Sequence, residues 1–212
     1  MADRWVCLDV GETLIDETRV WTTWANVLGV TPLTFMAALG AVLSRGDDHR
    51  ETFALVGHPD WRERYPDFNA AFGGFRQSDL YPDALSALAG LRAGGYQLAI
   101  VANQPASRTA ELRALGIEVD VMAMSDEFGF HKPSPDFYGH ALSLIGSPDP
   151  SSVAYVGDRL DNDVRPAVSA GMHPVWIRRG PWALLGSGEP AAGTLVVSSL
   201  DELLERIGEV WD

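Results

Sequence analysis

The sequence predicts an α/β protein with a doubly wound parallel sheet and a small helical unit inserted after the first strand. Short apolar runs recur along the chain without strict alternation of polar and apolar residues, as in strands that are buried on both faces. Helical patterns separate these runs, and strand–helix–strand alternation is typical of a parallel sheet covered by helices. One long stretch, residues 16–79, contains no convincing strand, which indicates the insertion.

The expected strands are apolar segments that end in polar or glycine-rich residues. In chain order they are WVCLD (5–9), YQLAIVAN (96–103), VDVMAM (119–124), SVAYVGD (152–158) and PVWIR (174–178), with a sixth indicated at TLVV (194–197).

The helices between these strands have recognisable starts and ends. Tyr81-Pro82-Asp83 opens a segment whose leucines share one face, and Gly94-Gly95 ends it. Proline in the first turn and glycine just past the last turn are the expected signals. Ser134-Pro135 opens a second helix, which ends at Gly146. Further helices are expected at 106–115, at 161–170 and in the C-terminal SLDELLERI (199–207).

The insertion has its own helical pattern. WANVLGV (24–30) favours a helix, and Thr31-Pro32 begins another in which Phe35, Leu39 and Val42 recur at helical spacing. Residues 44–79 are rich in charges and turn formers. We therefore predict a core made of residues 1–15 and 80–212, and a separate helical domain made of residues 16–79.

Composition limits the partners that this chain can have. The 212 residues carry a net charge of −13, so no general basic field exists to attract nucleic acid or an anionic membrane. Cys7 is the single cysteine, which excludes an intrachain disulfide and indicates a reducing compartment. The first residues lack a signal-peptide pattern, and no apolar run approaches the ~20 residues of a membrane span. We expect a cytoplasmic protein without a membrane partner.

Polar residues follow several of the predicted strands. Asp9 comes after the first strand, Asn103 after the second and Asp158 after the fourth, with Asp163 within about one further turn. Lys132, the one lysine among 16 basic residues, lies in the loop after the third strand. Ligands bind beyond the carboxyl ends of the strands in open α/β sheets, so these side chains are expected to converge on one site.

Four motifs carry a family resemblance: LDVGETL, IVANQ, HKPSPDFY and VGDRLDNDV, in that order. Together they resemble the haloacid dehalogenase-like hydrolase superfamily, most of whose members are Mg²⁺-dependent phosphatases. The resemblance covers nearly the whole chain. It implies a Rossmann-like core, a cap domain in residues 16–79, a small phosphorylated substrate, and a monomer or homodimer.

The resemblance also implies roles for individual residues. Asp9 would be the nucleophile that forms an aspartyl-phosphate. Mg²⁺ prefers oxygen ligands, and Asp9, the Gly11 carbonyl, Asp158 and Asp163 would hold it. Lys132 would stabilise charge on Asp9 and on the transferring phosphoryl oxygens. Helix capping is the alternative role for Asp158 and Asp163. Asp161 and Asn162 are expected to cap the helix or to support the site.

Two positions depart from the family pattern. Ala102-Asn103 stands where the family has Ser or Thr, so the Asn103 amide or backbone N–H groups at 103 and 104 would bind the phosphoryl group. Gly11 stands where family phosphatases usually have a second aspartate, which keeps the carbonyl and removes an acid/base group worth about 10²–10⁴-fold. Glu12 is the first candidate to replace it, followed by His131 and His49.

We expect a Mg²⁺-dependent phosphatase, with Arg19 as the first candidate for substrate binding within residues 16–79. A dehalogenase or phosphonatase is the second reading, because both also lack the second aspartate. Dehalogenases need no metal, however, and residues 16–79 contain no lysine to form the imine of a phosphonatase. A third reading is a catalytically weakened protein that binds a phosphorylated ligand or a protein partner.

Overall fold

The computed structural model describes residues 4–186 and 188–212, which contain a six-stranded parallel sheet in the order β3-β2-β1-β4-β5-β6. Every neighbouring pair of strands is parallel, and the predicted α/β fold class is confirmed. The strands are β1 (Trp5–Leu8), β2 (Gln97–Ala102), β3 (Val121–Met124), β4 (Val153–Gly157), β5 (His173–Ile177) and β6 (Leu195–Val197).

Helices cover both faces of this sheet. Successive residues of a strand point to opposite faces, so neighbouring residues pack against different helices. Val6 and Leu8 of β1 belong to the apolar cluster that includes helices α5 (Ala84–Ala93) and α11 (Leu200–Arg206). Cys7, between them, belongs to a second cluster with α8 (Pro135–Leu144) and α9 (Arg165–Ser169). The remaining helices beside the sheet are α6 (Arg108–Ala114), α7 (Ser125–Phe128) and α10 (Gly180–Leu185).

The predicted helix at 161–170 is divided into two parts. Residues Leu160–Val164 form a π-helical turn, and α9 begins only at Arg165. Asp163 is fully buried in this turn, where its Oδ2 accepts a hydrogen bond from the Arg159 backbone N–H at 2.9 Å. The wider turn therefore carries a carboxylate inward, toward the carboxyl end of β4.

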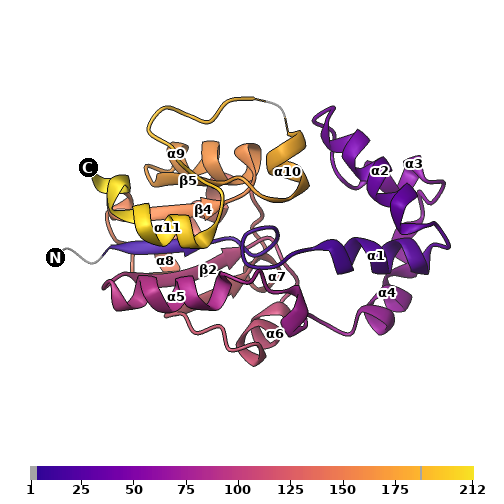
Figure 1. Ribbon diagram of the computed structural model, residues 1–212, viewed down its shortest axis with the longest axis horizontal. Helices are drawn as coiled ribbons and strands as arrows, with labels where there is room; N and C mark the ends of the chain where they lie inside the picture. The colour runs from indigo at the N-terminus through magenta and orange to yellow at the C-terminus, as the bar shows by residue number, and fades with distance from the viewer. Residues whose placement is uncertain (1–3, 187) are drawn as a thin grey trace.

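The insertion after β1 contains α1 (Thr18–Val27), α2 (Pro32–Leu43), α3 (Glu51–Leu55) and α4 (Tyr65–Phe72), which gather beyond the carboxyl ends of the strands (Figure 1). Aromatic rings pack these helices together: Trp24 stacks on Phe68 at 4.3 Å between ring centroids, and Phe53 stacks on Trp61 at 4.3 Å. Trp24, Phe53 and Phe68 belong to the same apolar cluster as Val6 and Leu8 of β1, so apolar packing is continuous from the insertion to the sheet.

The two segments that lead into and out of the insertion lie side by side. The Asp16 backbone N–H donates to the Asp79 carbonyl at 2.8 Å, and the Tyr81 N–H donates to the Leu14 carbonyl at 3.0 Å. Both segments approach the carboxyl end of β1. In the described residues no single helix has the length and apolarity to cross a membrane, although α1 and α2, which meet at 115°, pass that test as a bent pair.

Candidate active site

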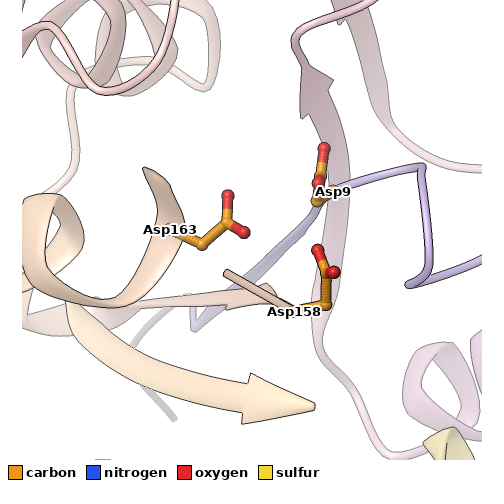
Figure 2. Close-up of side chains that lie close together, drawn as sticks. All are labelled: Asp9, Asp158 and Asp163. Atoms are coloured by element: carbon orange, nitrogen blue, oxygen red, sulfur yellow. The ribbon is translucent and has the colours of Figure 1, made fainter. Parts of the chain in front are cut away.

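Three buried carboxylates meet at the carboxyl edge of the sheet. Asp9 follows β1 and Asp158 follows the adjacent strand β4, while Asp163 comes from the π-helical turn (Figure 2). Each offers one oxygen, and these oxygens lie within 4.8 Å of one another. Gly157 makes the arrangement possible, because a Cβ on this residue would lie 2.3 Å from the Asp163 Cγ.

Lys132 is the cation of this group. Its Nζ lies 2.8 Å from Asp9 Oδ1 and 2.6 Å from Asp163 Oδ1. Burial alone would lower the pKa of the Lys132 ammonium, but the carboxylates of Asp163 and Asp9 outweigh burial and raise it. The lysine is therefore charged at neutral pH and offsets part of the negative charge of the carboxylates.

The charge that remains fits a divalent cation. Burial, together with the carboxylates of Asp163 and Asp9, raises the pKa of Asp158 well above its usual range. Within the described residues, Asp158 Oδ2 is buried and has no hydrogen-bond partner. A buried hydrogen-bond acceptor that receives no hydrogen bond lowers the stability of the folded state. Mg²⁺ prefers oxygen ligands, and three carboxylate oxygens converge here. The residues of the site thus fit Mg²⁺.

Asn103 fixes the loop that carries Lys132. Its side-chain Nδ2 donates to the Lys132 carbonyl at 3.0 Å, and its Oδ1 accepts from the Lys132 backbone N–H at 2.8 Å. The predicted residue lies at the site, but both ends of its amide hold protein backbone. Its geometry supports positioning of Lys132 rather than direct binding of a phosphoryl oxygen by the amide.

Glu12 lies beside the site with its carboxylate engaged. Oε2 accepts from the Tyr81 hydroxyl at 2.5 Å, and Oε1 accepts from the Glu17 backbone N–H at 3.1 Å. A Cβ on Gly180 would lie 2.3 Å from Oε2, so this carboxylate is also closely packed. These contacts brace the turn after β1, and they do not support the predicted acid/base role of Glu12.

Glu17 was not among the residues predicted from the sequence, yet it lines the same cavity as Asp9. The chain turns back after β1: the Glu12 N–H donates to the Ile15 carbonyl at 2.7 Å, which returns residue 17 to the site. A Cβ built on Gly11 would lie 2.6 Å from Glu17 Oε1. Burial raises the pKa of the Glu17 carboxyl to about 8, and the carboxylates of Glu12 and Asp9 act in the same direction. In the sequence, the one signal for this contact is the glycine at residue 11, which leaves room for another side chain.

Above the carboxylates lies a cavity of about 260 Å³ with aromatic walls. Residues of the insertion and of the sheet domain both contribute to its lining, and Trp21 of α1 contacts Trp182 of α10 with ring centroids 5.8 Å apart. The volume is suited to a small molecule. The aromatic and cationic lining residues are Trp21, His49, Tyr65, Phe75, Arg108, Lys132, Arg159 and Trp182.

Arg19, the predicted substrate-binding residue, is engaged elsewhere. Its Nε donates to Asp79 Oδ1 at 2.9 Å, another guanidinium nitrogen donates to the Phe72 carbonyl at 2.8 Å, and the guanidinium lies over the Phe72 ring. The side chain therefore fastens α1 to the end of the insertion and is not among the residues that line the cavity. Arg108, which the sequence did not single out, contributes a cation to the lining instead.

Comparison with known proteins gives a consistent family. The family model described as haloacid dehalogenase-like hydrolase matches residues 4–171. The chain is similar to the glyceraldehyde 3-phosphate phosphatase of Methanopyrus kandleri, with 40% identity over 105 residues, 48% of this chain and 45% of the relative. It is 34% identical over 130 residues to the enzyme of the same name from Methanocaldococcus jannaschii, covering 60% of this chain and 56% of the relative. The chain thus spans about half the length of these curated relatives.

A solved structure covers more of the chain. A HAD phosphatase from Thermococcus onnurineus superimposes with a TM-score of 0.61 and 26% identity, over 97% of this chain and 98% of that one. The similarity therefore extends through the insertion as well as the sheet.

Proposed function

Because the chain belongs to the haloacid dehalogenase-like hydrolase family, we propose that it is a phosphatase that releases inorganic phosphate from a small phosphorylated metabolite. The observation that carries this proposal is the buried group of Asp9, Asp158 and Asp163 with the Lys132 ammonium, of which Asp9, Asp158 and Lys132 line a small cavity. The phosphatase names of the similar proteins support the same class of reaction.

Asp9 is the nucleophile in this proposal. Lys132 contacts Oδ1, which orients the carboxylate and leaves Oδ2 for the substrate. Oδ2 attacks phosphorus, the bond from phosphorus to the ester oxygen breaks, and an aspartyl-phosphate forms. A water molecule then attacks phosphorus and breaks the bond to Asp9, which releases phosphate and restores the carboxylate. The Lys132 ammonium stabilises the charge that develops on the phosphoryl oxygens.

Asp9, Asp158 and Asp163 would hold Mg²⁺, and the Gly11 carbonyl would add a fourth oxygen. The backbone hydrogen bonds that close the turn after β1 are accepted by the carbonyls of Val10 and Ile15, so none of them engages the Gly11 carbonyl. When bound, the cation would neutralise the repulsion between the Asp9 carboxylate and the phosphate ester. The orphaned Asp158 Oδ2 supports its presence.

Residues 16–79 form a cap domain in this proposal, over a core of residues 1–15 and 80–212. Two features support the division: the paired backbone segments at Leu14–Asp16 and Asp79–Tyr81, and the cavity that both parts line. The cap would enclose the substrate, and its aromatic lining would select a small molecule. Removal of water from such a site strengthens the electrostatic contacts within it.

The test is hydrolysis of p-nitrophenyl phosphate by the purified protein in Mg²⁺ and in EDTA. We expect turnover that depends on Mg²⁺, and Asp9→Asn should abolish it. Asp60→Asn is the matched control, because this exposed aspartate of the insertion belongs neither to the carboxylate group nor to the cavity lining, and its replacement should leave turnover unchanged. Equal rates in Mg²⁺ and EDTA, or a parent protein no more active than Asp9→Asn, would contradict the proposal.

Binding without turnover would indicate the weakened-enzyme alternative. BeF₃⁻ mimics a phosphoryl group on an aspartate, so its capture in Mg²⁺ can be measured by the shift in unfolding temperature. Capture together with turnover supports the phosphatase, whereas capture with no product release supports a protein that only binds phosphorylated ligands.

A further inference from the structure

Hydrolysis of a phosphate ester leaves an oxygen that needs a proton, and the residue two positions after Asp9 has no side chain to provide one. A positioned acid is worth about 10²–10⁴-fold in such a step, more when the leaving group is a weak acid. The proton donor must lie in the cavity near Asp9. Three candidates follow from the sequence or from the cavity lining: Glu12, the histidines and Glu17.

The first two candidates are poorly placed. Glu12 has both oxygens engaged, by the Tyr81 hydroxyl and by the Glu17 backbone. His131 is exposed and lies outside the cavity lining. His49 reaches the cavity, but its ring packs against Trp21 and Trp182, at 5.9 and 6.1 Å between centroids, in the wall formed by the insertion and α10.

Glu17 occupies the space that a side chain at residue 11 would fill. Its Oε1 and carboxyl carbon lie 2.6 and 2.9 Å from the position of a Cβ on Gly11. The side chain lines the cavity together with Asp9 and Lys132. We propose that Glu17 supplies the carboxyl group that exchanges a proton with the leaving-group oxygen, in place of a side chain at residue 11. This inference rests on the proposed phosphatase function.

The proton balance follows from this placement. As Asp9 Oδ2 bonds to phosphorus and the ester bond breaks, the Glu17 carboxyl donates its proton to the departing oxygen. The Glu17 carboxylate then takes a proton from the water that attacks phosphorus, and the bond to Asp9 breaks. Phosphate is released, and both carboxyl groups return to their starting states.

The experiment compares two esters of similar shape, p-nitrophenyl phosphate and phenyl phosphate. Nitrophenolate leaves without a proton, whereas phenolate is the more basic leaving group. For Glu17→Gln we expect kcat/KM for phenyl phosphate to fall about 10²-fold, and kcat/KM for p-nitrophenyl phosphate to change less than about threefold. Rapid mixing of Glu17→Gln with p-nitrophenyl phosphate should give a burst of one nitrophenolate per enzyme, followed by slower turnover. The burst is expected because the variant forms the aspartyl-phosphate but lacks the carboxylate that takes a proton from the attacking water. Glu205→Gln, an exposed residue of α11, is the matched control.

A second variant tests the shared space directly. Glu17→Ala empties the volume beside Gly11, so Gly11→Asp can then place a carboxyl there; Gly11 is not in the left-handed backbone region, and its backbone accepts a side chain. The double variant should recover phenyl phosphate hydrolysis at least tenfold over Glu17→Ala. Unequal loss on the two esters in Glu17→Gln excludes a merely structural role, because a structural defect would lower both kcat/KM values alike, and the recovery then shows that a carboxyl in this space is sufficient.

The outcomes separate the two proposals. If the parent protein hydrolyses neither ester, the phosphatase function fails, and the role of Glu17 fails with it. If the parent hydrolyses both and Glu17→Gln lowers the two kcat/KM values equally, or lowers neither, the phosphatase stands and the inference on Glu17 is overturned. Unequal loss, with recovery in the double variant, supports Glu17.

Discussion

Replacement of Lys132 by methionine should make the stability of this protein depend on a divalent cation. The Lys132 Nζ lies within 2.8 Å of Asp9 and 2.6 Å of Asp163, and the lysine side chain is only 2% exposed. Methionine fills a similar volume without the charge. The Lys132→Met variant would therefore retain three buried carboxylates and no cation among them when Mg²⁺ is absent.

The size of the effect follows from the burial of the ion pairs. Removal of one partner from a buried pair costs about 3–5 kcal/mol, because the remaining charge is left without compensation in a medium of low dielectric constant. For a chain of this length, each kcal/mol lowers the unfolding temperature by about 2–4 °C. The expected loss in EDTA is therefore about 6–20 °C.

The pH dependence has a definite sign. Without the lysine, the pKa values of Asp158 and Asp163, which burial already raises in the parent, should rise further above the value of about 3.9 that aspartate has in an unfolded chain. The folded state then binds more protons than the unfolded state between these values, so its stability falls as pH rises through that range. The deficit of Lys132→Met should accordingly be larger at pH 8 than at pH 5.

Thermal unfolding, followed by circular dichroism in EDTA and in Mg²⁺, measures these effects. Arg45→Met is the control, because the Arg45–Asp47 pair is about half exposed and such pairs contribute about 0–1 kcal/mol. Mg²⁺ should restore part of the loss in Lys132→Met and stabilise it more than the parent. A Lys132→Met protein that unfolds in EDTA within about 2 °C of the Arg45→Met control would refute the reasoning.

Three further predictions concern the surroundings of the site. Asn103→Ala removes both hydrogen bonds to the Lys132 backbone and should lower the free energy of unfolding by about 1–3 kcal/mol in urea titrations; an unchanged midpoint would contradict this. Gly180→Ala forces a side chain onto a left-handed backbone (φ 74°) and against Glu12, and a loss of about 1–3 kcal/mol is expected by the same assay, with no loss as the contrary result. Burial raises the pKa of the Cys7 thiol to about 12, so at pH 8 the native protein should react with a disulfide reagent only as it unfolds; rapid labelling of the native protein would argue against this.

The fold was predictable because its signals are local. Each strand is an apolar run buried on both faces, and proline and glycine mark helix starts and ends along the chain. The helix predicted at 161–170 was the exception, since the burial of Asp163 beneath Gly157 depends on a neighbouring strand end. The periodicity of apolar residues reports on local structure and does not predict such a contact.

Residues at strand ends were equally accessible to prediction. Asp9 and Asp158 follow neighbouring parallel strands, so the topology alone brings them to one edge. The structure does not place Arg19 in the cavity lining, where it was expected from the sequence. The carboxylate that binds its guanidinium, Asp79, lies 60 residues later in the chain, so the sequence alone did not indicate this contact. A sequence identifies a cation near a site, but the partner that captures it is a property of the folded chain.

Gly11 and Glu17 could not be interpreted together from the sequence, because their contact forms only in the folded chain. Six positions separate them, and their contact depends on the turn that returns the chain at Ile15. A carboxyl on residue 11 would be fixed by the loop after β1 alone. A carboxyl on Glu17 lies at the start of α1, the first helix of the insertion, so its position depends on where that helix sits. If the insertion moves as a cap, displacement of α1 would withdraw the proton donor from Asp9, and leaving-group protonation would be available only when the cap is closed over a substrate.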